Sequence, residues 1–423
     1  MSSMFRSLHE PNYRKWFGGA LVSNTGTWMQ RTAQDWLVLT HLTDEDATAL
    51  GICMALQLGP QLLLFPFAGS IADKFPKRRL LLLTQILMGS MGLVLFVLTV
   101  TGAIALWHVY LLALLLGIVA TVDAPARHAF VSELVGEKLL ANAVSLNSAS
   151  FNSARMLGPA IAGVMTAAAG ASTVFLLSGL AFAGTVGVLL WLDGSRLHPP
   201  PPRRSEGKRG LLGGFSYLRT RTDIVVVLAV IFVVSTFGIN FNIYTATMAR
   251  VEFDRDAGAF GLLNSVLAVG SLTGALIAAK RELPRLRIVF FAAGGFGLAC
   301  GIAAVMPDYW TFAVALMLIG FSSITMLTCA NAYVQTTTPA HVRGRVMSVY
   351  SAVVMGGTPL GAPFAGWVAD LLGPRAALGV GAAAGVAGML VGAIWMLTAK
   401  HLRVERVRHS RLRLIHFTYD GHP

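Results

Sequence analysis

Twelve long apolar runs divide this sequence, and they constrain its fold more than any other feature. A helix needs about 20 apolar residues to cross the ~30 Å hydrocarbon core of a bilayer. Charged residues make up only 13% of the chain, whereas a soluble domain typically has about 25%. Membrane barrels are built from short alternating segments, which this sequence lacks. The predicted fold class is therefore an all-α polytopic membrane protein. The predicted spans cover residues 15–40, 48–72, 80–101, 104–123, 143–168, 172–192, 223–247, 258–279, 288–306, 309–333, 346–370 and 376–398.

The distribution of basic residues predicts the orientation in the membrane. Of the 33 Lys and Arg residues, 28 fall in the two termini and in the alternate loops that share one side. The loops of the other side hold three, at Arg250, Arg255 and Arg375. The positive-inside rule then places both termini in the cytoplasm, which requires an even number of crossings. The net charge of +13 is accordingly interpreted as a topology signal and a contact for membrane lipid headgroups, with no nucleic-acid partner.

The chain is predicted to consist of two six-helix halves, residues 1–192 and 223–399. Between them, residues 193–222 form a cytoplasmic linker with four consecutive prolines and seven basic residues. Residues 400–423 form a basic cytoplasmic tail. Consecutive prolines favour a stiff, extended segment, and the seven basic residues are expected to hold the linker at the cytoplasmic face.

Three glycines of the fifth predicted span recur 203 residues later in the eleventh. Small residues let helices approach closely in lipid, so this register predicts an internal repeat with a shared helix-packing role. Pro159 follows the first of these glycines. The three pairs are Gly158 with Gly361, Gly163 with Gly366, and Gly170 with Gly373.

Two of the predicted spans carry a polar stripe on one helix face. At about 100° per residue, the members of each stripe fall within an arc of roughly 60°. Lipid offers no partner for such groups, so the stripes are predicted to face protein or a water-filled cavity. The first-span stripe is Asn24, Trp28, Arg31 and Asp35, and the fifth-span stripe is Ser148, Asn152, Arg155 and Pro159.

Two interpretations of the intramembrane charges remain open at this level. Arg31 and Asp35 are four residues apart and can form a purely structural ion pair along one helix face. The alternative, which we favour, is that Asp35 serves both Arg31 and Arg155 in a cavity of net positive charge and exchanges a proton as that cavity opens to each side. The deep polar residues of the second half are uncharged, and each is expected to link helices or to bind cargo; they are Asn240, Asn242, Tyr244, Asn264 and Asn331.

The loop between the second and third spans reads GSIADKFPKRRLL from Gly69. It resembles the loop signature of the major facilitator superfamily, with Pro76 in place of the second glycine. The string RMLGPAIAG from Arg155 resembles the fifth-helix antiporter signature, although Ala154 and Ala162 replace two of its glycines. Longer strings, including NTGTWMQRTAQDWLVLTHLT and ANAVSLNSASFNSARMLGPAIAG, resemble the enterobactin-exporter-like branch of bacterial efflux proteins.

This resemblance implies the major facilitator fold, with two pseudo-symmetric six-helix bundles, in the bacterial cytoplasmic membrane. In that fold the first helix of each half lines a central cavity, so the first-span stripe is expected to form the wall of the substrate path. It also implies that Asp73, with Lys77 and Arg78, latches the two halves together at the cytoplasmic face when the outside is open. Asp123, Arg127 and Glu133 in the loop after the fourth span, with Arg343 and Arg345, are expected to complete this network. The simpler interpretation, that the basic residues only set topology, does not explain the acidic ones.

The function predicted from these features is secondary active transport, in the form of proton-coupled efflux of a small amphipathic drug or siderophore-like metabolite by alternating access. Residues 104–122 lack the arginine that drug/proton antiporters of the superfamily usually carry in the fourth span. Import of an anionic solute is the alternative within transport, and a non-transporting receptor or scaffold is the alternative from another class. We expect no enzymatic activity, cofactor or metal, because no phosphate-binding loop, metal-ligand spacing or nucleophile–base pair is recognisable. We also expect a monomer.

Overall fold

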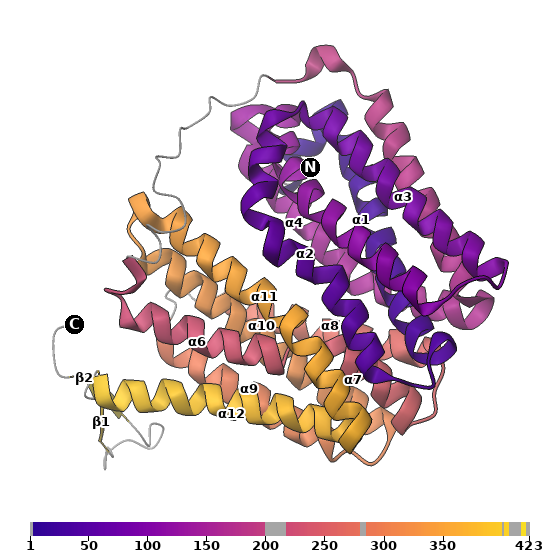
Figure 1. The fold of residues 1–423 in the computed structure, drawn as a ribbon. Coiled ribbons are helices and arrows are strands. Elements are labelled where there is room, and N and C mark those ends of the chain that lie inside the picture. The colour runs from indigo at the N-terminus through magenta and orange to yellow at the C-terminus, as the bar shows by residue number, and fades with distance from the viewer. Residues whose placement is uncertain (1–2, 199–216, 280–284, 400–401, 406–415, 420–423) are drawn as a thin grey trace.

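The computed structural model describes residues 3–198, 217–279, 285–399, 402–405 and 416–419, and its helices form two bundles (Figure 1). The proline run and most basic residues of the predicted linker, and most of the predicted tail, lie outside the described residues. The first half contains η1 (Ser3–His9), α1 (Pro11–Leu37), η2 (Val38–Leu42), α2 (Ala47–Lys74), α3 (Lys77–Val100), α4 (Leu106–Trp191) and η3 (Gly194–Arg196). The second half contains α6 (Thr222–Phe237), α7 (Phe241–Thr247), η4 (Met248–Glu252), α8 (Ala257–Ala279), α9 (Leu286–Ala304), α10 (Tyr309–Thr337), α11 (Ala340–Leu372) and α12 (Pro374–Ala399).

Helix α4 contains three of the predicted spans. They are separated by sharp bends at two glycines with positive φ, so α4 is three helical segments in sequence. Gly136 has φ +66° and Gly170 has φ +81°, a region that favours glycine because it lacks a Cβ. Nine helical stretches of the described chain are long and apolar enough to cross a membrane, with α4 counted once. Counting the three segments of α4 separately and adding α1, which the polar stripe makes less apolar, gives the twelve spans predicted from the sequence.

The predicted loop after the fourth span is in fact helical. Its residues continue α4 to Val135, so Asp123, Arg127 and Glu133 lie on a helix. The extension is stable because its apolar side packs on the start of α1, where the rings of Phe130 and Trp16 meet edge to face at 5.3 Å. The fourth span was predicted to end at residue 123 because the helix beyond that point is amphipathic, and hydropathy detects only the apolar part.

The seventh predicted span is broken between α6 and α7, at residues 238–240. The break frees backbone carbonyl groups that have no partner in lipid. Side chains from the same region bond two of them: Asn240 Nδ2 donates to the carbonyl of Thr236 at 2.9 Å, and the Tyr244 hydroxyl donates to that of Phe237 at 2.9 Å. Both α1 and α7 continue into a π-helical turn, η2 and η4 respectively, as expected of repeated halves.

The first glycine of each repeated trio packs against the first helix of its own half. A methyl group on Gly158 would lie 2.6 Å from the Cβ atom of Trp28 on α1. One on Gly361 would overlap the carbonyl of Thr236 on α6. The two positions therefore have equivalent surroundings in the two halves.

The second glycine of each trio packs across the boundary between the halves. A methyl group on Gly163 would lie 2.6 Å from the carbonyl oxygen of Ala257 on α8, and one on Gly366 would overlap the carbonyl of Ala47 on α2. The two halves therefore contact each other along two helix pairs, α4 with α8 and α2 with α11, which we call the seams. The third pair ends the spans, since Gly373 has φ +90° and so matches Gly170.

We call the side of the α2–α3 turn the linker face and the side of residues 43–46 and 253–256 the far face. The bundles meet toward the far face, where α2, α7, α8 and α11 come together, and diverge toward the linker face (Figure 1). Glu45 and Arg250 form a cross-half ion pair of 2.8 Å at the far face. Two further bonds join the halves, from the backbone N–H of Ala47 to Asp370 and from Asn242 to Asp35.

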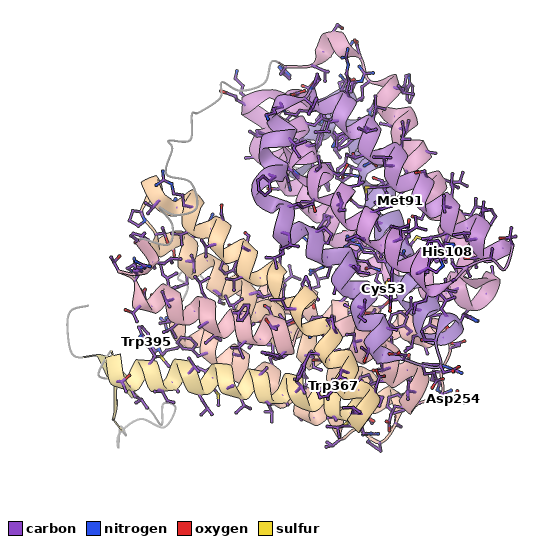
Figure 2. All side chains as sticks on the ribbon, viewed as in Figure 1. Cys53, Met91, His108, Asp254, Trp367 and Trp395 are labelled. Atoms are coloured by element: carbon purple, nitrogen blue, oxygen red, sulfur yellow. The ribbon has the colours of Figure 1, made fainter. Side chains whose placement is uncertain are left out.

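The outer surface carries many exposed apolar side chains, as a lipid-facing surface requires. Trp367 of α11 is 51% exposed and lies at the same end of the molecule as Asp254 in the far-face loop, whereas Cys53 lies within the first bundle (Figure 2). The tail adds one feature not predicted from the sequence. It is a short antiparallel hairpin of β1 (Leu402–Glu405) and β2 (His416–Tyr419), with Leu402 paired to Tyr419.

Candidate functional site

A cavity of about 480 Å³ lies between α1, α2, α3 and α4, with α11 of the other half contributing to its wall. Three members of each predicted stripe line it, while Asp35 and Pro159 do not. The ring of Trp28 meets that of Phe151 edge to face at 6.1 Å and forms an apolar part of the wall. The polar stripe residues on this wall are Asn24, Arg31, Ser148, Asn152 and Arg155, and the ion-paired Asp123 and Arg127 also line the cavity.

Three arginines line the cavity; Arg127 is paired with Asp123, whereas Arg31 and Arg155 form no ion pair within 4 Å with a carboxylate of the described residues. Arg31 is 7% exposed, its Nε atom makes no hydrogen bond, and its guanidinium lies 5.5 Å from the ring centre of Trp28. Arg155 is exposed to the cavity, and no described residue pairs with it. A buried guanidinium without a close ion-pair partner is costly, so the chemistry of this wall is compatible with a bound negative group.

Asp35 lies beyond the cavity toward the far face and is fully buried. The expected sharing of Asp35 between Arg31 and Arg155 is not observed, since no ion pair within 4 Å joins Asp35 to any described residue. Its Oδ1 atom instead accepts a hydrogen bond from Gln57 Nε2 of α2 at 3.2 Å. Its Oδ2 atom accepts one from Asn242 Nδ2 of α7, in the other half, at 2.8 Å. Two amide donors take the place of the predicted arginines.

Gln57 is a site residue that sequence reasoning missed. It is 3% exposed and lies one turn from Cys53, whose sulfur it approaches at 3.6 Å. The sequence did contain a signal for it: a polar glutamine inside the apolar second span is expected to face the bundle interior and hydrogen-bond there.

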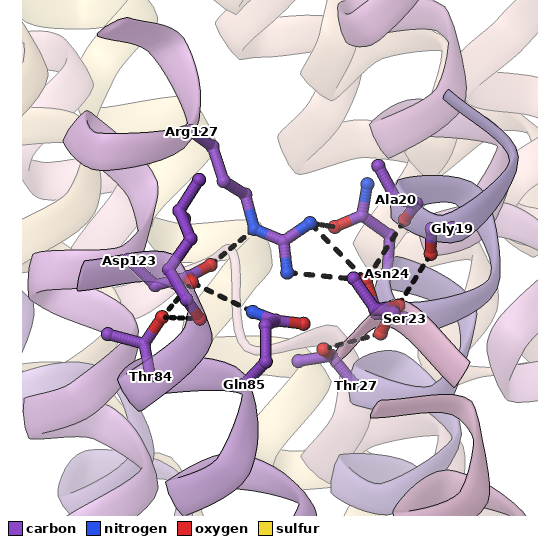
Figure 3. A network of polar contacts seen from close by, with 11 residues as sticks. Gly19, Ala20, Ser23, Asn24, Thr27, Thr84, Gln85, Asp123 and Arg127 are labelled. Atoms are coloured by element: carbon purple, nitrogen blue, oxygen red, sulfur yellow. Dashed lines mark hydrogen bonds and ion pairs between the residues drawn. The ribbon is translucent and has the colours of Figure 1, made fainter. Parts of the chain in front are cut away.

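A second polar network surrounds Asp123 on α4 (Figure 3). Its carboxylate forms an ion pair with Arg127 and accepts hydrogen bonds from Thr84 at 2.6 Å and Gln85 at 2.8 Å on α3. Both ionised residues are buried, and this number of partners is what a buried ion pair needs.

Arg127 extends this network to α1. It donates to the hydroxyl of Ser23 at 3.3 Å and to the amide oxygen of Asn24 at 3.4 Å (Figure 3). Its guanidinium also lies 5.6 Å from the ring centre of Trp16, in reach of a cation–π contact. The network thus holds α1, α3 and α4 together within the first half.

The loop after α2 makes contacts within its own half. Arg78 donates to the carbonyl groups of Leu189 at 2.8 Å and Leu190 at 3.1 Å, and so caps the C-terminal end of α4. Lys77 begins α3 and donates to the carbonyl of Phe75 at 3.3 Å. Gly69 lies in α2, and the side chain of Asp73 is outside the described part of the chain.

The sequence profile of the transmembrane secretion effector family of major facilitator proteins matches residues 2–415. The chain belongs to this family. The transporter is 27% identical over 360 residues to the staphyloferrin A transporter of Staphylococcus aureus (strain NCTC 8325 / PS 47), covering 84% of this chain and 89% of that protein. It is 26% identical over 373 residues to the enterobactin exporter EntS of Escherichia coli O127:H6, covering 86% of each.

Solved structures of major facilitator proteins share the fold of this transporter. The nucleoside transporter NupG aligns with a TM-score of 0.70 at 10% identity, over 90% of this chain and 98% of that one. A bacterial homologue of ferroportin in the inward-facing state aligns with a TM-score of 0.68 at 15% identity, over 91% and 98%. The predicted fold class and superfamily are confirmed, and the protein is a secondary transporter and not an enzyme.

The predicted cytoplasmic latch of the transporter stays a prediction. In the described state Arg78, Asp123 and Arg127 each bond within the first half. Arg343 likewise donates to the carbonyl of Thr338, within the second half, at 3.2 Å. A latch that forms when the far face opens would not be assembled here, because the two halves are in contact at the far face through the Glu45–Arg250 pair and the Ala47–Asp370 bond.

Proposed function

We propose that this transporter exports a small, anionic, siderophore-like compound across the bacterial cytoplasmic membrane in exchange for protons. The observation that carries the cargo class is that Arg31 and Arg155, unlike the third cavity arginine, Arg127, form no ion pair within 4 Å with a described carboxylate. Hydrogen bonds to a charged group contribute about 1.5–3 kcal/mol each, more than neutral ones. Siderophore names on two relatives, a staphyloferrin A transporter and an enterobactin exporter, support the same class.

The shape of the site supports an amphipathic cargo. Trp28 and Phe151 give the cavity an aromatic wall, and Asn152 and Ser148 lie one and two turns from Arg155 on α4. Pockets that bind small molecules are mostly apolar, with a few polar groups that fix orientation. An anion with an apolar body matches this combination better than a small inorganic ion does.

Orientation and direction complete the proposal. With the linker face in the cytoplasm, as the Lys and Arg bias predicts, both termini are cytoplasmic and the described state is closed to the outside. Cargo then enters a cavity whose α1 residues, Asn24 to Arg31, precede Asp35 on the path from the cytoplasm. Asp35 carries the exchanged proton, and the single chain, with both halves present, works as a monomer among lipids.

The test is export of named siderophores by cells and by vesicles. Enterobactin and staphyloferrin A, the compounds named for the two relatives, serve as probes in cells with and without the gene and in inverted vesicles. Arg31→Gln and Arg155→Gln are expected to lower uptake into inverted vesicles at least tenfold, while Arg14→Gln, an exposed arginine of α1, leaves it unchanged. Uptake into right-side-out vesicles would instead favour import of an anionic solute, and transport without arginine dependence would refute the cargo class.

A further inference from the structure

The proton site proposed at Asp35 is assembled from both halves of the molecule. Asp35 of α1 and Gln57 of α2 belong to the first half, whereas Asn242 belongs to α7 of the second. Asp35 is fully buried, and both of its oxygens accept a hydrogen bond from an amide group. The Asp35 carboxylate is therefore hydrogen-bonded by one residue of each half.

The break in the seventh span places Asn242 at this point. The chain leaves α6 after Phe237 and resumes at Phe241, so Asn242 is the second residue of the new helix. The irregular segment is fixed by Asn240 and Tyr244, which bond the freed carbonyl groups, and by Thr358 of α11, whose hydroxyl donates to the carbonyl of Ile239 at 3.4 Å. Asn242 is thus held toward α1 by a rigid support.

We infer that Asn242 is a positioning residue that makes closure of the far face depend on the ionisation of Asp35. This inference rests on the proton exchange proposed above. An ionised carboxylate accepts from both amides, whereas protonation converts one oxygen into a donor and removes one of the two acceptor sites. Gln57 belongs to the same half as Asp35, so a rigid-body separation of the halves breaks the bond to Asn242 and leaves the bond to Gln57.

The sequence of events follows from this geometry. Ionised Asp35 holds α7 against α1 and favours the state closed at the far face. Protonation weakens that bond and favours opening at the far face. The other titratable or charged groups that face Asp35 among the described residues are Arg31, on its own helix, and Cys53 on α2. Neither belongs to the second half, so only the Asn242 contact transmits the change across the seam.

Spin-label distances across the far face test this without any cargo. Labels are placed at Ala103→Cys and Val305→Cys, exposed loop positions of different halves, in a full-length chain with Cys53, Cys300 and Cys329 changed to Ala and reconstituted in lipid. The fraction of molecules with a long label distance is measured from pH 8 to pH 5. In the otherwise unchanged protein this fraction is expected to rise as the pH falls, and in Asp35→Asn it is expected not to change with pH.

Asn242→Ala and the near-isosteric Asn242→Leu are expected to raise the open-to-closed ratio at pH 8 about tenfold or more and to shrink its pH dependence by the same factor. Added to Asp35→Asn, either change should have little further effect on pH dependence, as a coupled pair requires. Asn264→Ala is the matched control. Asn264 is another buried amide of the second half that bonds only within that half in the described residues: its Nδ2 donates to the carbonyl of Phe260 at 3.1 Å, and its Oδ1 accepts from the Thr245 hydroxyl of α7 at 3.5 Å.

The outcomes separate the inference from the proposal beneath it. A uniform rise of the open fraction at every pH in both Asn242 variants, with the pH step intact, would mean that Asn242 only links helices and would overturn the inference alone. A pH-independent distance in the otherwise unchanged protein would overturn proton coupling at Asp35 and the inference with it. Loss of the pH step in the Asn242 variants but not in Asn264→Ala supports the inference.

Discussion

Asp370, near the end of α11, accepts a hydrogen bond from the backbone N–H of Ala47 at 2.7 Å, so one half of the transporter caps a helix of the other. The same carboxylate accepts from the N–H of Thr48 at 2.8 Å. A carboxylate at a helix N-terminus satisfies otherwise unpaired N–H groups and interacts favourably with the helix dipole. The position 203 residues earlier is Ala167, which lies beside Gly258 at the other seam. At these equivalent positions, the α2–α11 seam has a carboxylate that caps a helix of the other half, whereas the α4–α8 seam has an alanine.

Asp370→Asn is expected to weaken closure of the far face. Loss of a helix cap typically costs about 1 kcal/mol, which corresponds to roughly a fivefold higher open-to-closed ratio. Spin-label distances across the far face measure this ratio. Asp308→Asn is the control, because Asp308 caps α10 within one half; hydrogen bonds from Thr311 and Trp310 lower the pKa of its carboxyl. An equal opening in both variants would show that Asp370 does not act across the seam.

Gly361→Ala is expected to disturb the packing of α11 on α6. Its added methyl would overlap the Thr236 carbonyl, and overpacking of this kind costs about 1–3 kcal/mol. The thermal unfolding midpoint in detergent and the transport rate should both fall. Gly379→Ala on α12 has open space around it and should behave as the unchanged protein does. Equal stability of the two variants would contradict the close packing.

Asp123→Asn is expected to destabilise the first half strongly. Arg127 would be left buried without its counter-ion, and breaking a buried pair from one side costs about 3–5 kcal/mol. Changing Arg127→Gln as well should recover part of the loss. Thermal unfolding of the single and double variants measures this, with the exposed Asp193→Asn as a control. A double variant no more stable than Asp123→Asn would argue against the pairing.

Asp35→Asn is expected to separate exchange from accumulation. The amide keeps the shape of the side chain but cannot ionise, so inverted vesicles should still exchange labelled cargo down its gradient. They should lose accumulation driven by a proton gradient. Asp35→Glu keeps a carboxylate at a displaced position and should retain partial, pH-shifted coupling. Full gradient-driven accumulation by Asp35→Asn would remove Asp35 from the proton path.

Much of the fold was predictable because lipid imposes strict local rules on sequence. Span length, the bias of basic residues and the glycine register each depend on the residue's own chemistry. The stripes of α1 and α4 were predictable for the same reason, since helical periodicity assigns residues such as Arg31 and Arg155 to a face. Where the predicted boundary was wrong, after the fourth span, an amphipathic helix continued beyond the apolar run to pack against Trp16.

Helical periodicity assigns a residue to a face of its helix, but it does not identify the partner on a neighbouring helix. Those partners were revealed only by the tertiary structure. Asp35 bonds Gln57 and Asn242 and is not paired with the arginine one turn away. Asp370 caps a helix 323 residues away along the chain. Such contacts depend on how rigid helices cross, and the crossing is set by close approaches such as Gly366 on α2, which involve surfaces far apart in sequence. The sequence by itself determined which groups must find a polar partner in the membrane, and the packing of the two halves determined which partner each one found.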